Sequence, residues 1–210
     1  MSTPHYHTGK IRAGILGGAG YTGGELIRVL LNHDNCDIAF VHSRSNAGRP
    51  VASVHGDLDG ETDLRFTDTT GDADVIFLCM GHGESRRYLE NNPVPDDTRI
   101  IDLSSDFRLS ETSVTGNRQF VYGLPEINRE RIRESQNIAN PGCFATAIQL
   151  GLLPLAKAGL LTDVYTTGIT GSTGAGQSMS QTSHFSWRAN NIQSYKTLTH
   201  QHLHEINESL

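Results

Sequence analysis

Cysteine is scarce in this chain, and long apolar runs are absent from it. The three cysteines, Cys36, Cys79 and Cys143, lie far apart and form no CxxC pair, which excludes a disulfide framework and a thiolate zinc site and is typical of a reducing compartment. The run Val75–Met80 is far shorter than the ~18 apolar residues that span a bilayer. The N-terminus lacks the apolar stretch of a secretory signal. The sequence therefore predicts a cytoplasmic or organellar-matrix protein with no membrane partner.

The chain also lacks blocks of like charge. Lys and Arg number 17 against 23 Asp and Glu, for a net charge of −6. Nucleic acid is therefore not predicted as a partner, because the chain lacks the basic patch that would bind its phosphates. A hydrophobic content of 36% plus 22 glycines suffices for a packed core. At about 150 residues per domain, 210 residues make one large domain, or one complete domain and part of a second.

Glycine, in contrast, is concentrated in one turn. The segment Gly17–Gly23 follows a short apolar run and repeats glycine as GxxGxxG, close to the dinucleotide fingerprint GxGxxG. Leu26, Val29 and Leu30 then predict a helix by their spacing. Glycine lets the backbone approach a diphosphate, and the N–H groups at the helix start attract its charge; the alternative is a turn that binds nothing. The predicted cofactor contacts are Gly17, Gly20, Tyr21, Thr22 and Gly23.

The second predicted strand, Asp37–His42, ends where a dinucleotide-binding fold meets the adenosine ribose. A site for NAD usually places Asp or Glu there, whereas this chain reads SRSN from Ser43 onward. An arginine flanked by hydroxyls suits a 2′-phosphate, so the sequence favours NADP(H). The alternative is that Arg44 is a solvated loop residue. The further predicted cofactor contacts are Ser43, Arg44, Ser45 and Gly81.

Strands and helices alternate in the first two thirds of the chain. Apolar runs predict strands at Ala73–Met80 and Arg99–Leu103, with a short helix over Glu84–Asn91 between them. This alternation predicts an α/β fold, a Rossmann-like doubly wound parallel sheet. Ligands bind beyond the carboxyl ends of such strands, which places Gly17, Ser43, Gly81 and Ser104 around one crevice.

We expect three parts along the chain. Residues 1–9 form a disordered N-terminus, and residues 10–145 an NADP-binding Rossmann domain. Residues 146–210 begin a catalytic or substrate domain of α+β type that is incomplete. Its first β-rich stretch is Leu161–Gly168, and a polar, loop-like tail follows.

Cys143 is the candidate nucleophile. Asn140-Pro141-Gly142 precedes it, and a helical pattern follows directly, so the thiol lies at or near a helix N-terminus that favours a thiolate. A proton shuttle is needed, and His200 or His202 supplies an imidazole. Histidines on alternate residues are equally typical of a two-faced strand, a surface cluster or adventitious metal binding. No carboxylate or thiolate spacing supports a structural metal site, so none is predicted.

Four motifs in order resemble one enzyme family. They are Gly17–Leu26, Asp102–Arg108, Tyr122–Glu126 and Asn140–Cys143. This set is similar to the N-acetyl-γ-glutamyl-phosphate reductase family of arginine biosynthesis, from about residue 10 to the last residue. Aspartate-semialdehyde dehydrogenases share the fold and the cysteine chemistry, but the last two motifs resemble the glutamyl-phosphate branch.

The resemblance implies NADPH-dependent reductive dephosphorylation of an acyl phosphate. The Cys143 thiolate would form a thioester and release inorganic phosphate, hydride from NADPH would reduce it to a semialdehyde, and a histidine would move the proton. Arg108 would hold a carboxylate or phosphate of the substrate. The resemblance also implies a homo-oligomer, a dimer or tetramer. The implied substrate-binding residues are Ser105, Arg108, Asn140, Ser172, Thr173 and Glu205.

The chain departs from the family pattern in two places. It reads HQHLHEI from His200 where the family usually has HRHxPEI, so His200 is the first choice as acid/base and His202 the second. Family members also continue well past Leu210, which predicts a fragment or a weakly active chain that associates through an open face. An aspartyl-phosphate substrate, or an NADP-binding sensor without catalysis, are the alternatives. The acyl group on the substrate nitrogen stays open between acetyl, succinyl and a carrier.

Overall fold

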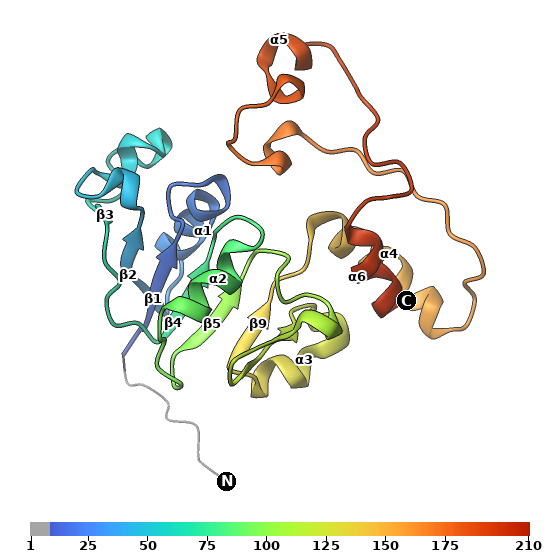
Figure 1. The fold of residues 1–210 in the computed structure, drawn as a ribbon, viewed down its shortest axis with the longest axis horizontal. Helices are drawn as coiled ribbons and strands as arrows, with labels where there is room; N and C mark the ends of the chain where they lie inside the picture. Colours follow the sequence, from blue (N-terminus) through green and yellow to red (C-terminus); the bar gives the residue numbers. More distant parts are fainter. Residues whose placement is uncertain (1–8) are drawn as a thin grey trace.

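A computed structural model describes residues 9–210. Its centre is a seven-stranded sheet in the order β3-β2-β1-β4-β5-β9-β8, in which every neighbouring pair is parallel (Figure 1). The predicted doubly wound parallel sheet is confirmed. The strands are β1 Ile11–Leu16, β2 Cys36–His42, β3 Phe66–Thr67, β4 Val75–Leu78, β5 Arg99–Asp102, β8 Val121–Tyr122 and β9 Asn137–Ala139, and an antiparallel hairpin adds β6 Val114–Thr115 and β7 Arg118–Gln119.

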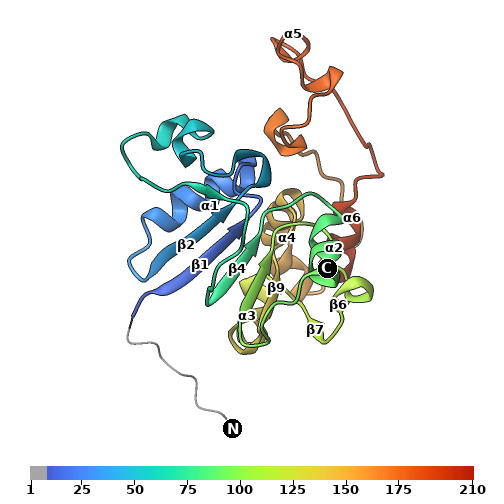
Figure 2. The ribbon, with the colours of Figure 1, turned by 60° about the vertical axis from the view of Figure 1, so that its left-hand side comes forward.

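Helices connect the strands and cover the sheet (Figures 1 and 2). The predicted segment Glu84–Asn91 is a helix with the same bounds. Of residues 1–9, predicted to be disordered, residues 1–8 lie outside the described part of the chain. The helices are α1 Tyr21–Leu31, α2 Glu84–Asn91, α3 Pro125–Glu134, α4 Cys143–Lys157, α5 Phe185–Arg188 and α6 His202–Ser209, and short 3-10 turns lie at Arg44–Asn46, Val51–Ser53, Gly56–Leu58, Ser110–Thr112, Ser172–Ala175 and Gln181–Ser183.

The core lies on both faces of the sheet. Ile15 and Leu16 are consecutive and both fully buried, and they belong to two different apolar clusters. Since consecutive strand residues point to opposite faces, each cluster covers one face. Ile27 of α1 packs in one cluster and Phe107 in the other. Burial on both sides is the pattern of a parallel sheet between two helical layers.

Helix α1 turns a different face to the sheet than its apolar residues suggest. Of Leu26, Val29 and Leu30, only Leu30 is buried, and Val29 is 63% exposed. The buried line instead runs through Gly23, Ile27 and Leu30. Glycine at the first of these positions lets the helix approach the strand closely, and this approach decides which face is covered.

The chain beyond α4 has little regular structure. The predicted β-rich stretch Leu161–Gly168 contains no strand, because no other segment in residues 9–210 pairs with it and an unpaired strand leaves its backbone groups without partners. The tail predicted to be loop-like does form two unforeseen helices, the short α5 and the longer α6, and α6 packs against α4. Residues between them extend away from the sheet (Figures 1 and 2). Within the described residues, no helix has the length and apolarity to cross a membrane.

Candidate active site

The site lies at the carboxyl edge of the parallel strands. Gly17 follows β1, Ser43 follows β2, Gly81 lies beyond β4 and Ser104 follows β5, as predicted. Asn140 follows β9 at the same edge, and its backbone N–H donates to the carbonyl of Asp102 at 2.8 Å. The strand order therefore brings together segments that are far apart in the sequence.

The turn Gly17–Gly23 has the close backbone packing of a diphosphate site. Gly17 has a φ of +80°, and a Cβ there would collide with the Cys79 carbonyl. A Cβ on Gly23 would lie 2.6 Å from the Gly17 carbonyl oxygen. Helix α1 begins after Gly20 with no side-chain cap, so the N–H groups of its first turn face an incoming ligand. Tyr21 and Thr22 are exposed at that turn.

His55, which no pattern in the sequence predicts as a site residue, contacts the backbone of this turn. It is 6% exposed, and its Nε2 lies 2.8 Å from the carbonyl oxygen of Gly18. A carbonyl can only accept, so Nε2 carries the proton. A Cβ on Gly24 would lie 2.5 Å from the same ring. No local motif marks His55, because its partner is distant in sequence.

The adenosine end of the crevice is basic and hydroxyl-rich. Ser43 is buried, and its Oγ accepts a hydrogen bond from Asn46 Nδ2 at 3.1 Å. Arg44 and Ser45 are exposed in the following turn. Arg49, which was not among the predicted residues, donates to Asn46 Oδ1 at 3.0 Å. Two guanidinium groups therefore lie on this short segment, with Ser43 in a supporting position beneath it.

Cys143 is the exposed thiol of the three and the first residue of α4. Gly142 caps the helix without a side-chain bond, so N–H groups of the first turn are available beside the sulfur. Burial raises the pKa of the Cys79 thiol to about 12 and also raises the pKa of Cys36. Exposure and the helix start therefore single out Cys143 as the thiol able to react.

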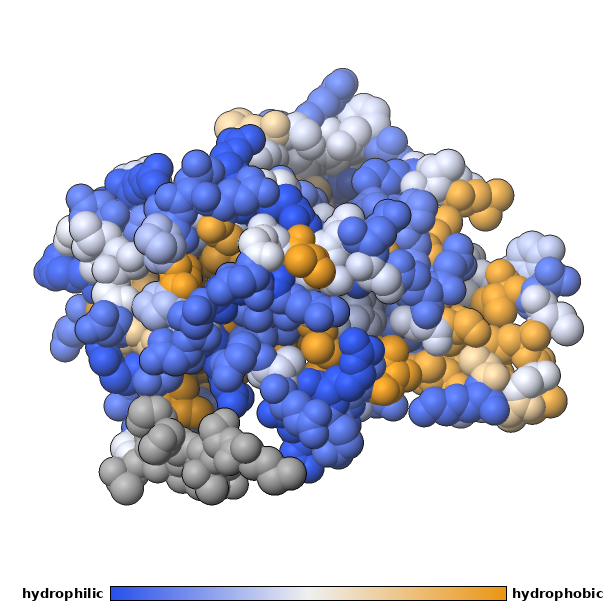
Figure 3. Space-filling model, turned by 60° about the horizontal axis from the view of Figure 1, so that its bottom comes forward, coloured by the Kyte–Doolittle hydropathy of each residue, from blue (hydrophilic) through white to orange (hydrophobic). Residues whose placement is uncertain are grey.

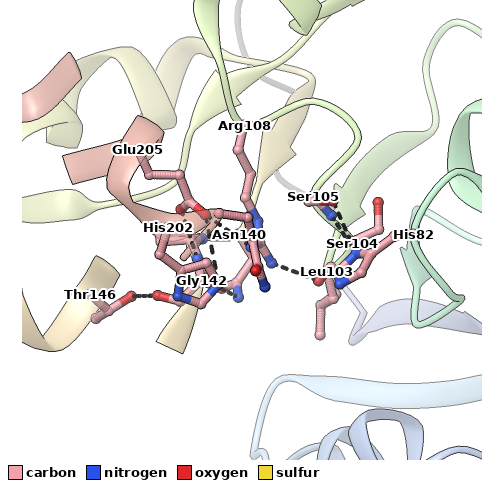
Figure 4. A network of polar contacts seen from close by, with 12 residues as sticks. His82, Leu103, Ser104, Ser105, Arg108, Asn140, Gly142, Thr146, His202 and Glu205 are labelled. Atoms are coloured by element: carbon pink, nitrogen blue, oxygen red, sulfur yellow. Dashed lines mark hydrogen bonds and ion pairs between the residues drawn. The ribbon is translucent and has the colours of Figure 1, made fainter. Parts of the chain in front are cut away.

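A buried ion pair underlies this helix start (Figure 4). Glu205 accepts from Arg108 Nη1 at 3.1 Å, from the Tyr122 hydroxyl at 2.9 Å and from the Gly142 backbone N–H at 2.9 Å. The Arg108 and Glu205 side chains are 6% and 4% exposed. Burial and the Glu205 carboxylate raise the pKa of Tyr122, so its hydroxyl keeps its proton as the donor. Glu205 thereby ties α6 to the residue that precedes the thiol.

Arg108 is occupied on all three nitrogens. Besides Glu205, Nε donates to the Asn140 carbonyl at 2.9 Å and Nη2 to the Leu103 carbonyl at 3.0 Å. In this structure Arg108 and Glu205, both predicted to contact the substrate, are each buried against the other. The physical reason is that two opposite charges in a buried position require each other.

Both candidate histidines lie beside the start of α4. Helix α6 begins at His202, so the alternating histidines are neither a strand nor one surface cluster. A Cβ on Gly142 would collide with His202 Nε2, and that nitrogen lies 4.0 Å from Glu205 Oε1. Burial lowers the pKa of His202, with Glu205 opposing the shift. The His200 ring packs edge-on against Phe144, and burial lowers its pKa also.

Most residues of the motif Asp102–Arg108 make hydrogen bonds that hold neighbouring segments in place. Asp102 is fully buried and accepts from Ser104 Oγ at 2.7 Å, and burial raises its pKa. Asp106 accepts from the backbone N–H groups of Gly83 at 2.6 Å and Arg86 at 3.0 Å, which caps α2. The motif therefore positions the loop after β4 as well as the ion pair.

Two family models match this chain. Residues 12–135 match the NAD binding domain of semialdehyde dehydrogenase, and residues 143–210 match the semialdehyde dehydrogenase dimerisation domain. The chain belongs to the semialdehyde dehydrogenase family.

Similar proteins include curated bacterial enzymes. The N-acetyl-γ-glutamyl-phosphate reductase of Parabacteroides distasonis is 55% identical over 203 residues, which are 95% of this chain and 62% of that protein. The reductase of the same name from Bacteroides thetaiotaomicron is 56% identical, with the same coverage. This chain thus spans about 62% of the length of these relatives. A solved aspartate semialdehyde dehydrogenase with NADP from Candida albicans superposes with a TM-score of 0.51 over 72% of this chain and 48% of that chain, at 16% identity, and shows the fold alone.

The geometry of this crevice fits a nicotinamide dinucleotide. The glycines at 17, 20 and 23 leave a backbone cradle at a helix start, and a Cβ at two of them would clash. Among residues 9–210 no cluster of metal-ligating side chains is present.

The remaining predicted substrate residues lie on separate segments of the chain. The Asn140 side chain is exposed just before Cys143, and Ser105 is half-buried beside the loop after β4. Ser172 and Thr173 lie in the 3-10 turn Ser172–Ala175. Gln177, four residues after Thr173, joins this part of the chain to the dinucleotide turn, because its Nε2 donates to the carbonyl of Ala19 at 3.1 Å.

Proposed function

We propose that this protein catalyses the NADPH-dependent reduction of N-acetyl-γ-glutamyl phosphate to N-acetylglutamate semialdehyde and phosphate. The observation that carries the proposal is the exposed Cys143 thiol at the start of α4, with His202 against the preceding residue. The names of the two relatives that are 55% and 56% identical over 203 residues support this substrate. The cysteine content suits a cytoplasmic enzyme of arginine biosynthesis.

Cys143 performs the covalent step. His202 takes the thiol proton, and the thiolate attacks the γ-acyl carbon. The bond from that carbon to the phosphate oxygen breaks, phosphate leaves, and a Cys143 thioester remains. NADPH supplies the hydride that reduces the thioester carbon. The carbon–sulfur bond then breaks, the aldehyde forms, and His202 returns the proton to the sulfur.

His202 is better placed than His200 for this role. Its Nε2 lies close to Gly142, one residue before the nucleophile, whereas the His200 ring packs edge-on against Phe144, one residue after it. A lowered pKa leaves the His202 imidazole neutral near pH 7, the form that accepts a proton. His200 packs against His202 with ring centroids 4.5 Å apart and serves to orient it.

Arg108 and Glu205 position the nucleophile rather than bind the substrate. Glu205 fixes the Gly142 N–H, and Arg108 fixes the Asn140 carbonyl, so the two charges hold both ends of the short segment before Cys143. The exposed Asn140 and the half-buried Ser105 remain the substrate contacts, together with Ser172 and Thr173 of the 3-10 turn Ser172–Ala175. Arg44 and Ser45 bind the 2′-phosphate of NADP(H).

The protein forms a homo-oligomer, a dimer or tetramer, through the part that matches the dimerisation domain. Apolar side chains gather on the side of the molecule that carries α4 and α6 (Figure 3). An exposed apolar face of this kind is typical of a contact between copies. The exposed apolar side chains of this part include Leu150, Leu155, Leu160, Val164 and Leu203.

The test is NADP⁺ reduction in the reverse direction with N-acetylglutamate semialdehyde and phosphate. We expect activity in the wild type and a loss of at least about a thousandfold in Cys143→Ser, with NADPH binding retained. Faster turnover of aspartate semialdehyde would contradict the substrate. Absent turnover with intact NADPH binding would favour a dinucleotide-binding sensor.

A further inference from the structure

His82 lies in the loop between β4 and α2 and has no part in the steps above. Its ring is exposed, at the same sheet edge as the Asn140 segment. Its Nδ1 accepts from the Ser105 backbone N–H at 3.1 Å and lies 3.0 Å from Ser105 Oγ (Figure 4). His82 therefore belongs to the crevice by position.

The contact with Ser105 decides where the proton of the His82 ring lies. A backbone N–H can only donate, so Nδ1 holds a lone pair, and the neutral ring carries its proton on Nε2. The Ser105 hydroxyl must then donate to the same Nδ1 as well. His82 thus presents an N–H, not a lone pair, from its exposed nitrogen.

The loop that carries His82 is fixed on both sides. Asp106 accepts from the Gly83 N–H, and the Glu84 N–H donates to the Gly81 carbonyl at 3.0 Å. Gly83 adopts a φ of +80°, which favours glycine. Ser105 and Asp106 are adjacent, so one motif sets both the loop and the ring. A donor held in place before a ligand arrives loses little freedom on binding.

We propose that His82 is a binding residue whose Nε2–H donates to an anionic phosphate oxygen in the crevice. This inference rests on the proposed function, which brings two such groups there: the phosphate that leaves the acyl carbon, and the diphosphate of the dinucleotide. A neutral imidazole donor suits an anion without placing a second full charge beside His202.

The test compares His82→Phe, which keeps a ring without the donor, with His82→Gln, whose amide supplies an N–H at similar reach. For the phosphate-dependent reverse reaction of the natural protein, we expect His82→Phe to raise the KM for phosphate by about tenfold or more, as for a lost hydrogen bond to a charged group. His82→Gln should recover most of this loss. The KM for the semialdehyde should stay within about twofold in both, because the donor acts on phosphate alone.

His33→Phe is the matched control. His33 also accepts a backbone N–H at Nδ1, from Asn35 at 3.2 Å, but it is exposed beyond the C-terminal end of α1. This variant should match the wild type in every constant. A rise in the KM for NADP⁺ instead of phosphate in His82→Phe would assign the oxygen to the dinucleotide. Unchanged constants for both ligands, or a loss in kcat alone, would overturn the proposal.

A readout without turnover separates this inference from the proposed function. Phosphate or NADP⁺ in the crevice should slow alkylation of Cys143 by iodoacetamide, and His82→Phe should weaken the protection by one of them about tenfold. If the wild type is protected but turns over no semialdehyde, the proposed function fails and the inference stands. Equal protection in wild type and His82→Phe overturns the inference.

Discussion

Helices α1 and α4 begin in the same way but are held by different chemistry. Each starts after a glycine cap with no side-chain cap bond, and at each a histidine ring packs so closely on a glycine that a Cβ would clash. At α1 the brace is His55, which donates from Nε2 to a carbonyl of the turn. At α4 it is the buried ion pair of Arg108 and Glu205. The dinucleotide end therefore depends on nearby packing, and the thiol end on a charged contact from the last helix.

Of the substitutions that separate the two helix starts, Glu205→Gln should have the largest effect. It leaves the Arg108 guanidinium buried without its counter-charge, which typically costs about 3–5 kcal/mol of unfolding free energy. We expect α6 to detach from α4 and the alkylation rate of Cys143 to change, while NADPH affinity holds. Urea unfolding measures the loss of stability, thiol labelling measures the alkylation rate of Cys143, and NADPH fluorescence measures the cofactor affinity. Equal loss of NADPH affinity would show that the two helix starts are not independent.

Gly142→Ala and Gly24→Ala form a matched pair. Each added Cβ meets a histidine ring, His202 in one case and His55 in the other. Overpacking of this kind costs about 1–3 kcal/mol. The first change should lower kcat with little effect on the KM for NADP⁺, and the second should do the reverse. Steady-state kinetics of both variants measures kcat and the KM for NADP⁺. The same change in both variants would contradict the view that the two helix starts serve different functions.

His55→Leu tests how much the histidine contact contributes to the dinucleotide turn before α1. Its loss leaves the Gly18 carbonyl without its donor, and we expect NADPH affinity to fall about tenfold. His55→Gln should recover part of the affinity through its amide N–H. Alkylation of Cys143 without cofactor should not change in either variant. Fluorescence titration gives the affinities, and a fall shared by Leu and Gln variants alike would point to packing alone.

The smallest effect concerns pH. The pKa of His202 lies below its usual 6.5 in the folded chain, chiefly through burial, so the unfolded chain binds its proton first as pH falls. Stability from this group is complete above about pH 6.5 and declines below it. Glu205 opposes this trend, while His200, Arg108 and His82 reinforce it. Unfolding free energies of wild type and His202→Gln between about pH 5 and 8 should converge at the acid end; parallel curves would contradict the prediction.

Local sequence predicted the first two thirds of the fold well. The strand, turn and helix around Gly17–Gly23 and the helix Glu84–Asn91 follow from periodicity and from glycine, both of which act over a few residues. The strand predicted at Leu161–Gly168 was wrong, because a strand needs a partner that periodicity does not supply. Helix α6 was missed because its stability comes from packing on α4.

The sequence by itself determined the sheet, the dinucleotide turn and the thiol at a helix start, since each depends on neighbouring residues and their backbone preferences. Only the tertiary structure decided that Arg108 and Glu205 face each other rather than a ligand, that His55 braces the turn, and that Ser105 fixes the tautomer of His82. Those contacts join segments far apart in the chain. Burial makes their partners obligatory, and burial is a property of the folded molecule.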